Sequence, residues 1–247
     1  MRETFAREKP VIQVKKLRKE YIMGQEKVVA LRDINLSLYR GEICCIFGTS
    51  GSGKSTLLNQ LAGLEKPTRG QVLIGGVPVS HLDENQLAAF RQKHIGFVFQ
   101  SYNLLPELTA LENVAMPLMF RGIDKDTRER EAMKMLARVG LKDRIHHFPG
   151  QMSGGQQQRA GIARAFITRP DVVFADEPTG NLDSKTTKEV MAMIRSFARK
   201  FHQTIVLVSH DPEMTEYADR IVTLIDGEVV SDVKTENNLQ QSKGEVI

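Results

Sequence analysis

The feature that most constrains the fold is a glycine-rich segment directly after a short apolar run, Ile43 to Phe47. The segment consists of Gly48, Thr49, Ser50, Gly51, Ser52, Gly53, Lys54, Ser55 and Thr56. It matches the pattern Gly-x4-Gly-Lys-Ser/Thr, in which glycines let backbone N–H groups turn towards phosphate oxygens. A helix predicted from about Lys54 to Ala62 would face the same anion with its positive end. The segment therefore predicts a phosphate-binding loop, with Lys54 reaching the β and γ phosphates and the Ser55 hydroxyl ligating Mg²⁺.

Two other apolar runs predict the kind of sheet that holds this loop. Val172 to Ala175 and Thr204 to Val208 are short, predominantly apolar and followed by polar turn residues, and helical stretches separate the runs. This is the pattern of parallel strands buried on both faces, and such sheets bind ligands at the carboxyl ends of their strands. We therefore predict an α/β P-loop fold with a mostly parallel core sheet.

Two adjacent acids, Asp176 and Glu177, follow the second apolar run. A phosphate loop alone is compatible with kinases, GTPases and ATPases. Asp176 is placed to hold the Mg²⁺ shell, and Glu177 to take a proton from an attacking water. Adjacent carboxylates at the end of a buried strand favour hydrolysis over transfer to a second small substrate. The alternative is a pair of solvated acids.

The rest of the chain predicts an antiparallel β layer, a helical insertion and two tails. Val11 to Val14 and Ile34 to Leu38 alternate between apolar and polar residues, and Val72 to Val79 predicts a hairpin. A second hairpin is predicted from Ile221 to Val230. The expected organisation is an N-terminal tail (1–10), one domain (11–230) with a helical insertion (about 101–155), and a polar C-terminal tail (231–247).

Composition narrows the function further. The formal charge of +4 is scattered and alternates with acids, as in Asp124 to Glu131, which argues against a nucleic-acid partner. Residues 1–10 lack the apolar stretch of a signal peptide, and no apolar run reaches the roughly 18 to 20 residues that cross a bilayer. Cys44 and Cys45 indicate core residues of a reducing compartment. We expect a cytoplasmic chain without a transmembrane segment, whose membrane role depends on a partner.

A second glycine-containing segment stands at the predicted start of another helix. It comprises Ser153, Gly154, Gly155 and Gln156, and it follows Met152. A hydroxyl, flexible backbone amides and a helix dipole together make a possible second anion site. The alternative is that Ser153 is an ordinary N-cap and the glycines form a turn. One nucleotide does not obviously need two such sites.

With these three segments in this order, the chain resembles the nucleotide-binding subunits of ABC transporters from about Val11 to Val230. Met152 replaces the more usual leucine of the family signature. The resemblance implies ATP hydrolysis with ATP and Mg²⁺ as cofactors. Its further implied site residues are Gln100 as sensor of the γ phosphate and Mg²⁺, Tyr21 stacked on adenine, His210 on the γ phosphate, and Asp183 in contact with a second subunit. Glu177, His210, Gln100 and Lys54 would form the catalytic set, and Ser55, Gln100 and Asp176 the metal set.

The resemblance also implies two partners. Each nucleotide would lie between the phosphate loop of one subunit and the Ser153–Gln156 segment of another, so the chain would form an ATP-sandwich homodimer. The other partner would be a membrane permease with an extracytoplasmic domain, which would place the chain on the inner face of the membrane. Residues 100–106 and 178–184 resemble the branch of macrolide exporters, lipoprotein-releasing complexes and the division-associated pair.

The permease is expected to dock near Gln100 to Met119, where apolar residues gather. These are Leu104, Leu105, Leu108, Met116, Leu118 and Met119. The alternative is that they pack the helical insertion. Two other functions stay open, namely a soluble ABC ATPase acting on ribosomes or DNA, and a phosphoryl-transferring kinase. The kinase would leave Ser153 and Glu177 without a role.

Overall fold

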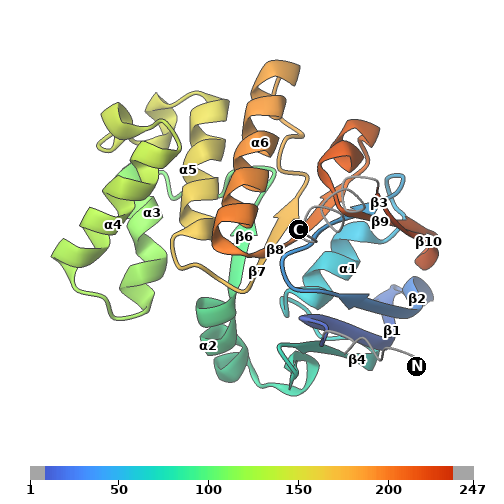
Figure 1. Cartoon of the computed structure of the whole chain (residues 1–247). Coiled ribbons are helices and arrows are strands. Elements are labelled where there is room, and N and C mark those ends of the chain that lie inside the picture. Colours follow the sequence, from blue (N-terminus) through green and yellow to red (C-terminus); the bar gives the residue numbers. More distant parts are fainter. Residues whose placement is uncertain (1–8, 236–247) are drawn as a thin grey trace, which may run out of the picture.

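A six-stranded sheet forms the centre of the computed structural model, which describes residues 9–235 (Figure 1). Its strand order is β10-β9-β3-β8-β7-β6, and every neighbouring pair is parallel except β10 and β9. The strands are β3 (Ile43–Phe47), β6 (Ile95–Val98), β7 (Val172–Asp176), β8 (Thr204–Ser209), β9 (Arg220–Ile225) and β10 (Glu228–Lys234). The prediction of a mostly parallel core sheet is confirmed.

A four-stranded antiparallel sheet forms a separate layer, in the order β2-β1-β4-β5. Its strands are β1 (Ile12–Met23), β2 (Glu26–Leu38), β4 (Arg69–Ile74) and β5 (Val77–Pro78). The first two strands extend well beyond the alternating runs that predicted them. Register shifts between Val14 and Glu20 interrupt the alternation while the pairing of β1 with β2 continues, and the sequence pattern is lost at such bulges.

Helices cover the two faces of the core sheet differently (Figure 1). α1 (Lys54–Leu61) shares one face with the antiparallel sheet, whereas α5 (Gly154–Phe166) and α6 (Ser184–Phe201) cover the other. The predicted helical insertion contains α3 (Ala110–Phe120) and α4 (Lys125–Arg138), which pack outside α5. α2 (Glu84–His94) leads into β6. Within residues 9–235, no helix combines the length and the apolar character needed to span a bilayer.

The residues of β3 alternate between two hydrophobic clusters. Ile43 and Cys45 join the cluster under α3 to α6, while Cys44 and Ile46 join the cluster with α1 and the antiparallel sheet. Burial on both faces explains why the strand is apolar throughout. Burial also raises the pKa of both free thiols, that of Cys45 to about 12, so these cysteines are core residues and not nucleophiles.

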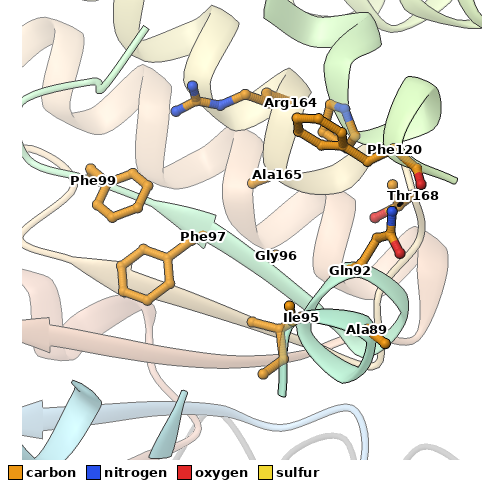
Figure 2. A pocket seen from close by; sticks show the side chains of 12 residues that line it. Ala89, Gln92, Ile95, Gly96, Phe97, Phe99, Phe120, Arg164, Ala165 and Thr168 are labelled. Carbon is orange, nitrogen blue, oxygen red and sulfur yellow. Dashed lines mark hydrogen bonds between the residues drawn. The ribbon is translucent and has the colours of Figure 1, made fainter. Parts of the chain in front are cut away.

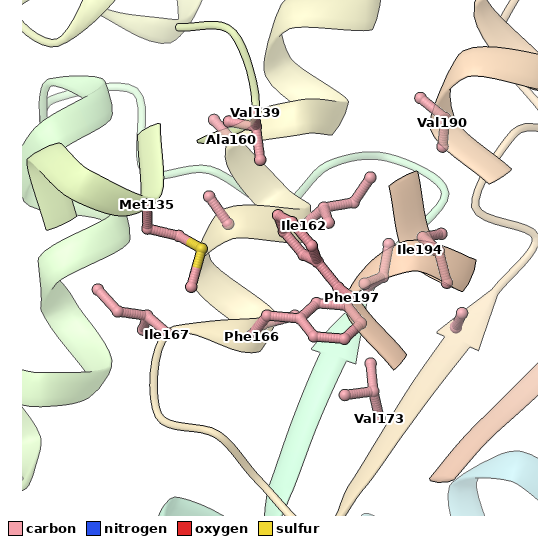
Figure 3. Packing of buried hydrophobic residues seen from close by; sticks show 14 of the residues in the cluster. Met135, Val139, Ala160, Ile162, Phe166, Ile167, Val173, Val190, Ile194 and Phe197 are labelled. Atoms are coloured by element: carbon pink, nitrogen blue, oxygen red, sulfur yellow. The ribbon is translucent and has the colours of Figure 1, made fainter. Parts of the chain in front are cut away.

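The cluster under α5 and α6 fixes the position of both helices (Figure 3). Phe166 of α5 and Phe197 of α6 meet edge to face, with ring centroids 5.4 Å apart. Met135 of α4 closes the cluster from the side of the insertion, and Val173 of β7 forms its floor. The start of α5 is therefore carried on a tightly packed helix.

The last strand runs past the predicted boundary at residue 231, because β10 ends at Lys234. Arg220 of β9 holds it, with Nε and Nη2 each 2.6 Å from one carboxylate oxygen of Asp232. A bidentate ion pair gives no periodic signal in the sequence, which is why the sequence pattern predicts a polar tail where this edge strand continues. The rest of the predicted C-terminal tail, and residues 1–8 of the N-terminal one, lie outside the described residues.

Candidate active site

The predicted phosphate loop joins β3 to α1 at the carboxyl end of the core sheet. Gly51 and Gly53 have φ angles of 80° and 99°, a region that favours glycine. Gly48 is needed for space, because a methyl group there would lie 2.2 Å from the carbonyl oxygen of Leu224. Gly53 is the N-cap of α1, and it brings no side-chain cap. The first N–H groups of α1 are therefore available to an anion.

Lys54 and Ser55 begin α1 and point their polar atoms at the loop and at β7. Lys54 is 5% exposed, and its ammonium donates to the carbonyl oxygen of Thr49 at 2.7 Å. The Ser55 hydroxyl donates to Oδ1 of Asp176, the last residue of β7, at 3.4 Å. Burial, reinforced by the charge of Glu177, raises the pKa of Asp176. A nearby cation would therefore stabilise the charged form of this carboxylate.

Glu177 adopts a backbone conformation that is unusual for its type. Its φ angle is 42°, and its N–H donates to the carbonyl oxygen of Val208 at 3.0 Å. Oε1 of Glu177 lies 2.8 Å from Nδ1 of His210, whose side chain is 59% exposed. Left-handed non-glycine residues cost energy and cluster at functional sites. The structure thus brings together two residues predicted to act on the γ phosphate and its attacking water.

A cavity of about 710 Å³ opens over the loop. Its lining contains eight predicted residues, Ser50, Gly51, Gly53, Lys54, Ser55, Thr56, Glu177 and His210. Six further lining residues were not predicted, Val28, Val29, Ala30, Arg32, Asp226 and Gly227. They come from β2 and the β9–β10 turn, which are joined by a hydrogen bond from Arg32 N–H to Gly227 O at 2.8 Å. No nucleotide-binding motif marks them, because β2 of the antiparallel layer and the β9–β10 turn of the core sheet reach the loop only in the folded chain.

Tyr21 lies beside this cavity without lining it. It pairs with Val28 across β1 and β2, and directly opposed residues of antiparallel strands place their side chains on one face. Val28 lines the cavity and is 43% exposed. The Tyr21 hydroxyl donates to Oε2 of Glu65 at 2.7 Å, and burial together with this bond raises the pKa of the phenol. Its predicted contact with adenine stays a prediction.

Gln100 follows β6 and does not line the cavity. A methyl group on Gly180 would lie 2.7 Å from Nε2 of Gln100, and Nδ2 of Asn181 donates to the Gln100 carbonyl at 3.2 Å. Gln100 therefore packs on the segment that leads to Asp183.

Asp183 is the N-cap of α6. Its carboxylate accepts hydrogen bonds from Thr186 N–H and Lys185 N–H at 3.0 Å each, and these bonds lower the pKa of Asp183. The roles predicted for both residues stay predictions.

The Ser153–Gln156 segment is the N-terminus of α5, on the sheet face opposite α1. The Ser153 hydroxyl accepts from Gln156 N–H at 3.3 Å, and Oε1 of Gln156 accepts from Ser153 N–H at 3.0 Å. This capping box matches the alternative interpretation of Ser153 as a helix cap. None of the four residues lines the cavity over the phosphate loop. Within one chain, the two anion sites are therefore separate.

The donors present fit Mg²⁺. Ser55 and Asp176 offer a hydroxyl and a carboxylate within hydrogen-bond distance of each other, and Mg²⁺ typically takes one or two protein oxygens together with phosphates and water. Among residues 9–235, no group of three or more His, Cys, Asp or Glu could hold a metal by itself. A metal at Ser55 and Asp176 would therefore share its shell with the phosphates. The contacts described for the third predicted ligand, Gln100, are with Gly180 and Asn181.

Comparison with known proteins places this site in a family. The family model described as ABC transporter matches residues 31–180, which is more than half of the chain. The chain belongs to the ABC transporter family. The predicted ABC-type ATPase is thereby confirmed, and the kinase alternative is ruled out.

Relatives of this ABC family member fall into two sizes. An uncharacterized ABC transporter ATP-binding protein of Methanocaldococcus jannaschii, MJ1508, is 49% identical over 220 residues, which cover 89% of this chain and 98% of the relative. The macrolide export ATP-binding/permease protein MacB of Pasteurella multocida is 42% identical over 238 residues, 96% of this chain but 36% of MacB. The chain thus spans about a third of the MacB proteins, and their names agree with the predicted branch.

The fold agrees as well. A solved structure described as a dimeric post-hydrolysis state of the ATP-binding cassette MJ0796 bound to ADP and Pi has a TM-score of 0.85 and 42% identity. The match covers 90% of this chain and 98% of that one. The predicted α/β P-loop fold is confirmed.

Proposed function

We propose that this chain hydrolyses ATP as one half of a homodimer, with each ATP held between the phosphate loop of one copy and the Ser153–Gln156 segment of the other. The observation that carries the proposal is the placement of the two anion sites. They stand on opposite faces of the core sheet, so one copy cannot close them on one nucleotide. The description of MJ0796 as a dimer in a post-hydrolysis state with ADP and Pi supports a dimer that hydrolyses ATP.

Within the site, each residue has a defined task. The loop N–H groups and Lys54 bind the β and γ phosphates, and this charge-assisted binding fixes the γ phosphate for attack. Mg²⁺ held by Ser55 and Asp176 would supply charge neutralisation on the phosphates. Glu177 takes the proton of the attacking water, and His210 orients its carboxylate through the 2.8 Å contact. Tyr21 and Val28 form the rim on which the adenine rests.

We further propose a membrane permease as the second partner, seated in an apolar groove of about 490 Å³ (Figure 2). Phe97 of β6, Phe99 just after that strand and Phe120 of α3 line it, and Phe120 is 62% exposed. MacB is described as an ATP-binding and permease protein in one chain, which argues for a permease segment as the occupant. The groove lies almost entirely outside the predicted docking region of residues 100–119, because only Pro117 of its lining residues falls within that range.

The apolar residues of that predicted docking region are divided between core and surface. Leu104 and Leu118 pack against the helical core, which agrees with the alternative given above for them. Leu105 and Met119 are each 45% exposed. The groove is therefore a better-defined docking surface than the run of leucines. An extracytoplasmic domain of the permease, and a location on the inner face of the membrane, complete the proposal for this branch.

The decisive experiment uses Glu177→Gln. The variant is expected to lower ATP turnover by about 10²- to 10⁴-fold, the range for loss of a general base, while ATP binding is kept. A sizing column with ATP and Mg²⁺ should then show a stable dimer that the wild type populates only briefly. A matched control is Glu213→Gln, an exposed acid beyond His210, which should behave as wild type. A Glu177→Gln chain that binds ATP and stays monomeric would refute the shared site.

The soluble alternative, an ABC ATPase acting on ribosomes or DNA, makes a different prediction. It requires no membrane partner, whereas the proposed function requires a permease that stimulates ATP turnover. The MacB proteins of Pasteurella multocida and Photorhabdus laumondii are described as macrolide export ATP-binding/permease proteins, which favours the membrane-linked function. Co-purification from detergent-solubilised membranes through an affinity-tagged chain distinguishes the two.

A further inference from the structure

Arg164 of α5 makes contacts that the site described above does not explain. Its Nη1 donates to the carbonyl oxygen of Asn103 at 2.5 Å, and its Nη2 donates to the carbonyl oxygen of Tyr102 at 2.8 Å. Burial lowers the pKa of this guanidinium. An arginine placed among backbone carbonyls loses hydration, and the two hydrogen bonds offset that cost. The contact therefore fixes one specific backbone conformation opposite α5.

The backbone that Arg164 holds is unusual. Tyr102 and Asn103 have φ angles of 62° and 48°, two consecutive left-handed residues without a glycine. Such residues persist only where surrounding contacts over-determine them. The turn is also tightened by a hydrogen bond from Asn103 N–H to the Ser101 carbonyl at 2.6 Å. It begins two residues after Gln100, so its shape sets where Gln100 can lie.

The same turn touches the start of α5. A methyl group on Gly154 would lie 2.6 Å from the hydroxyl oxygen of Tyr102, and one on Gly161 would lie 3.5 Å from the Tyr102 carbonyl oxygen. Tyr102 therefore packs along α5 from the Ser153–Gln156 segment towards Arg164. The turn after Gln100 and the helix that carries the second anion site are held together at both ends of this contact.

Arg164 also faces the apolar groove. Figure 2 shows it among the lining residues, with its aliphatic stem over Ala165 and its guanidinium extended away from Phe120. A segment seated between Phe99 and Phe120 would therefore contact the side chain that holds the turn. One residue thus borders the groove, the Gln100 turn and, through Tyr102, the start of α5.

We propose that Arg164 is a positioning residue for ATP hydrolysis, because it locks the 102–103 turn onto α5 and so fixes Gln100 relative to the Ser153–Gln156 segment. The proposal deepens the proposed function and rests on it. Without the two Arg164 hydrogen bonds the 102–103 turn can relax. The phosphate loop, which leads into α1 on the other face of the sheet, keeps its shape. Turnover falls, and binding of ATP to a single copy does not.

The test compares Arg164→Met with Arg121→Met. Arg121 is a close match, because its guanidinium also donates to backbone carbonyls, those of Gln92, Lys93 and Thr168, and burial also lowers its pKa. It ties α3 to α2 and to the far end of α5, away from Gln100. Both substitutions remove carbonyl hydrogen bonds from a packed arginine, so a merely structural role predicts equal effects.

Two measurements separate the variants. Arg164→Met should lower kcat by about 10- to 100-fold, the scale for a small misplacement of a reacting group, with single-copy ATP affinity within about twofold of wild type. Backbone hydrogen exchange at residues 100–104 should accelerate in Arg164→Met and stay at the wild-type rate in Arg121→Met. Arg164→Lys keeps the charge but has one ammonium for two carbonyls, and it should show an intermediate loss of kcat.

The outcomes are distinct. Equal kcat in Arg164→Met and Arg121→Met, or unchanged exchange at residues 100–104 in Arg164→Met, overturns the proposal. If Arg164→Met does not fold, Arg164→Lys against Arg121→Lys gives the same comparison. A wild-type chain without any ATP turnover refutes the proposed function instead, and the exchange measurement then still decides whether Arg164 holds the turn.

Discussion

The starts of α1 and α5 are both glycine-rich helix N-termini, yet they are built in opposite ways. The N-cap of α1 is Gly53, in the left-handed region and without a side-chain cap, whereas the N-cap of α5 is Ser153, with a complete capping box. Gly48 at the first site packs against the backbone oxygen of Leu224, while Gly155 at the second packs against the side chain of Thr186. The first start is rigid and leaves its N–H donors to a ligand. The second is satisfied within its own chain.

This difference bears on why a homodimer is needed. A helix start without a cap can bind phosphate strongly by itself, because its donors have no competing partner. A capped start retains the helix dipole and a hydroxyl, so it contributes to a site that another element has already formed. We infer that α1 supplies affinity for ATP and that α5 of the partner copy completes the site for turnover.

The largest expected effects on ATP binding and turnover come from separate substitutions at the N-termini of α1 and α5. Lys54→Ala should weaken ATP binding by about 10- to 100-fold, because a hydrogen bond to a charged group contributes about 1.5–3 kcal/mol. Ser153→Asp keeps a good N-cap but puts a negative charge against the nucleotide of the partner copy. It should leave single-copy ATP binding intact and lower turnover by about 30- to 150-fold, the equivalent of a like-charge penalty of about 2–3 kcal/mol.

Mixing the two variants sharpens the result. A mixed dimer contains one site in which both the phosphate loop and the Ser153 segment are wild type, so an equal mixture should recover roughly a quarter of the wild-type turnover. Steady-state phosphate release measures this directly. A mixture as inactive as its components would show that the two starts do not share a nucleotide.

The next effect concerns the two glycines and folding stability. Gly48→Ala should lower the free energy of unfolding by about 3 kcal/mol, since its methyl group meets backbone that cannot move aside. Gly155→Ala should cost less than about 1 kcal/mol, because a methyl group there lies 2.7 Å from a movable side-chain carbon of Thr186 and alanine favours the helix. Urea unfolding measures both values.

The double variant Gly155→Ala with Thr186→Ser tests the cause. Serine lacks the clashing methyl group but keeps the hydroxyl that donates to Asp183 at 2.7 Å. The double variant should be at least as stable as Gly155→Ala alone, with a coupling energy that a double-mutant cycle detects. If Gly48→Ala were as mild as Gly155→Ala, the contrast in rigidity between the two helix starts would be wrong.

The two helix N-termini could be predicted from the sequence, whereas most of the cavity over the phosphate loop could not. Gly53 to Ser55 and Ser153 to Gln156 act through contiguous backbone, so their chemistry is written in consecutive residues. Val28 of β2 and Asp226 of the β9–β10 turn reach the cavity from positions distant in the chain, and only the packing of the two sheets places them there. The Arg164 lock joins residues 61 and 62 positions apart, and no spacing rule predicts it.

The smallest expected effect concerns the acid that faces α1. The pKa of Asp176 is raised by burial and by Glu177, whereas the pKa of Asp171, before the same strand, is lowered because hydrogen bonds from His94 and Arg40 outweigh its burial. A raised carboxyl pKa means that the folded state binds more protons than the unfolded one between the ordinary value of 3.8 and the folded value. Across that window Asp176 reduces stability as pH rises, and at neutral pH it opposes folding.

Asp176→Asn should therefore raise the Tm of the nucleotide-free chain at pH 7, whereas Asp171→Asn should lower it, since a lowered pKa stabilises the fold above the ordinary value and loses that contribution as pH falls. Each shift should be about 2–4 °C at most, equivalent to about 1 kcal/mol for a partly exposed group in a chain of this size. Scanning calorimetry at pH 7 gives both signs. A lower Tm for Asp176→Asn would show that this carboxylate is held by the protein itself and not kept for a cation beside Ser55. In that case the α1 start would be as self-satisfied as the α5 start, and the contrast between them would not explain the shared site.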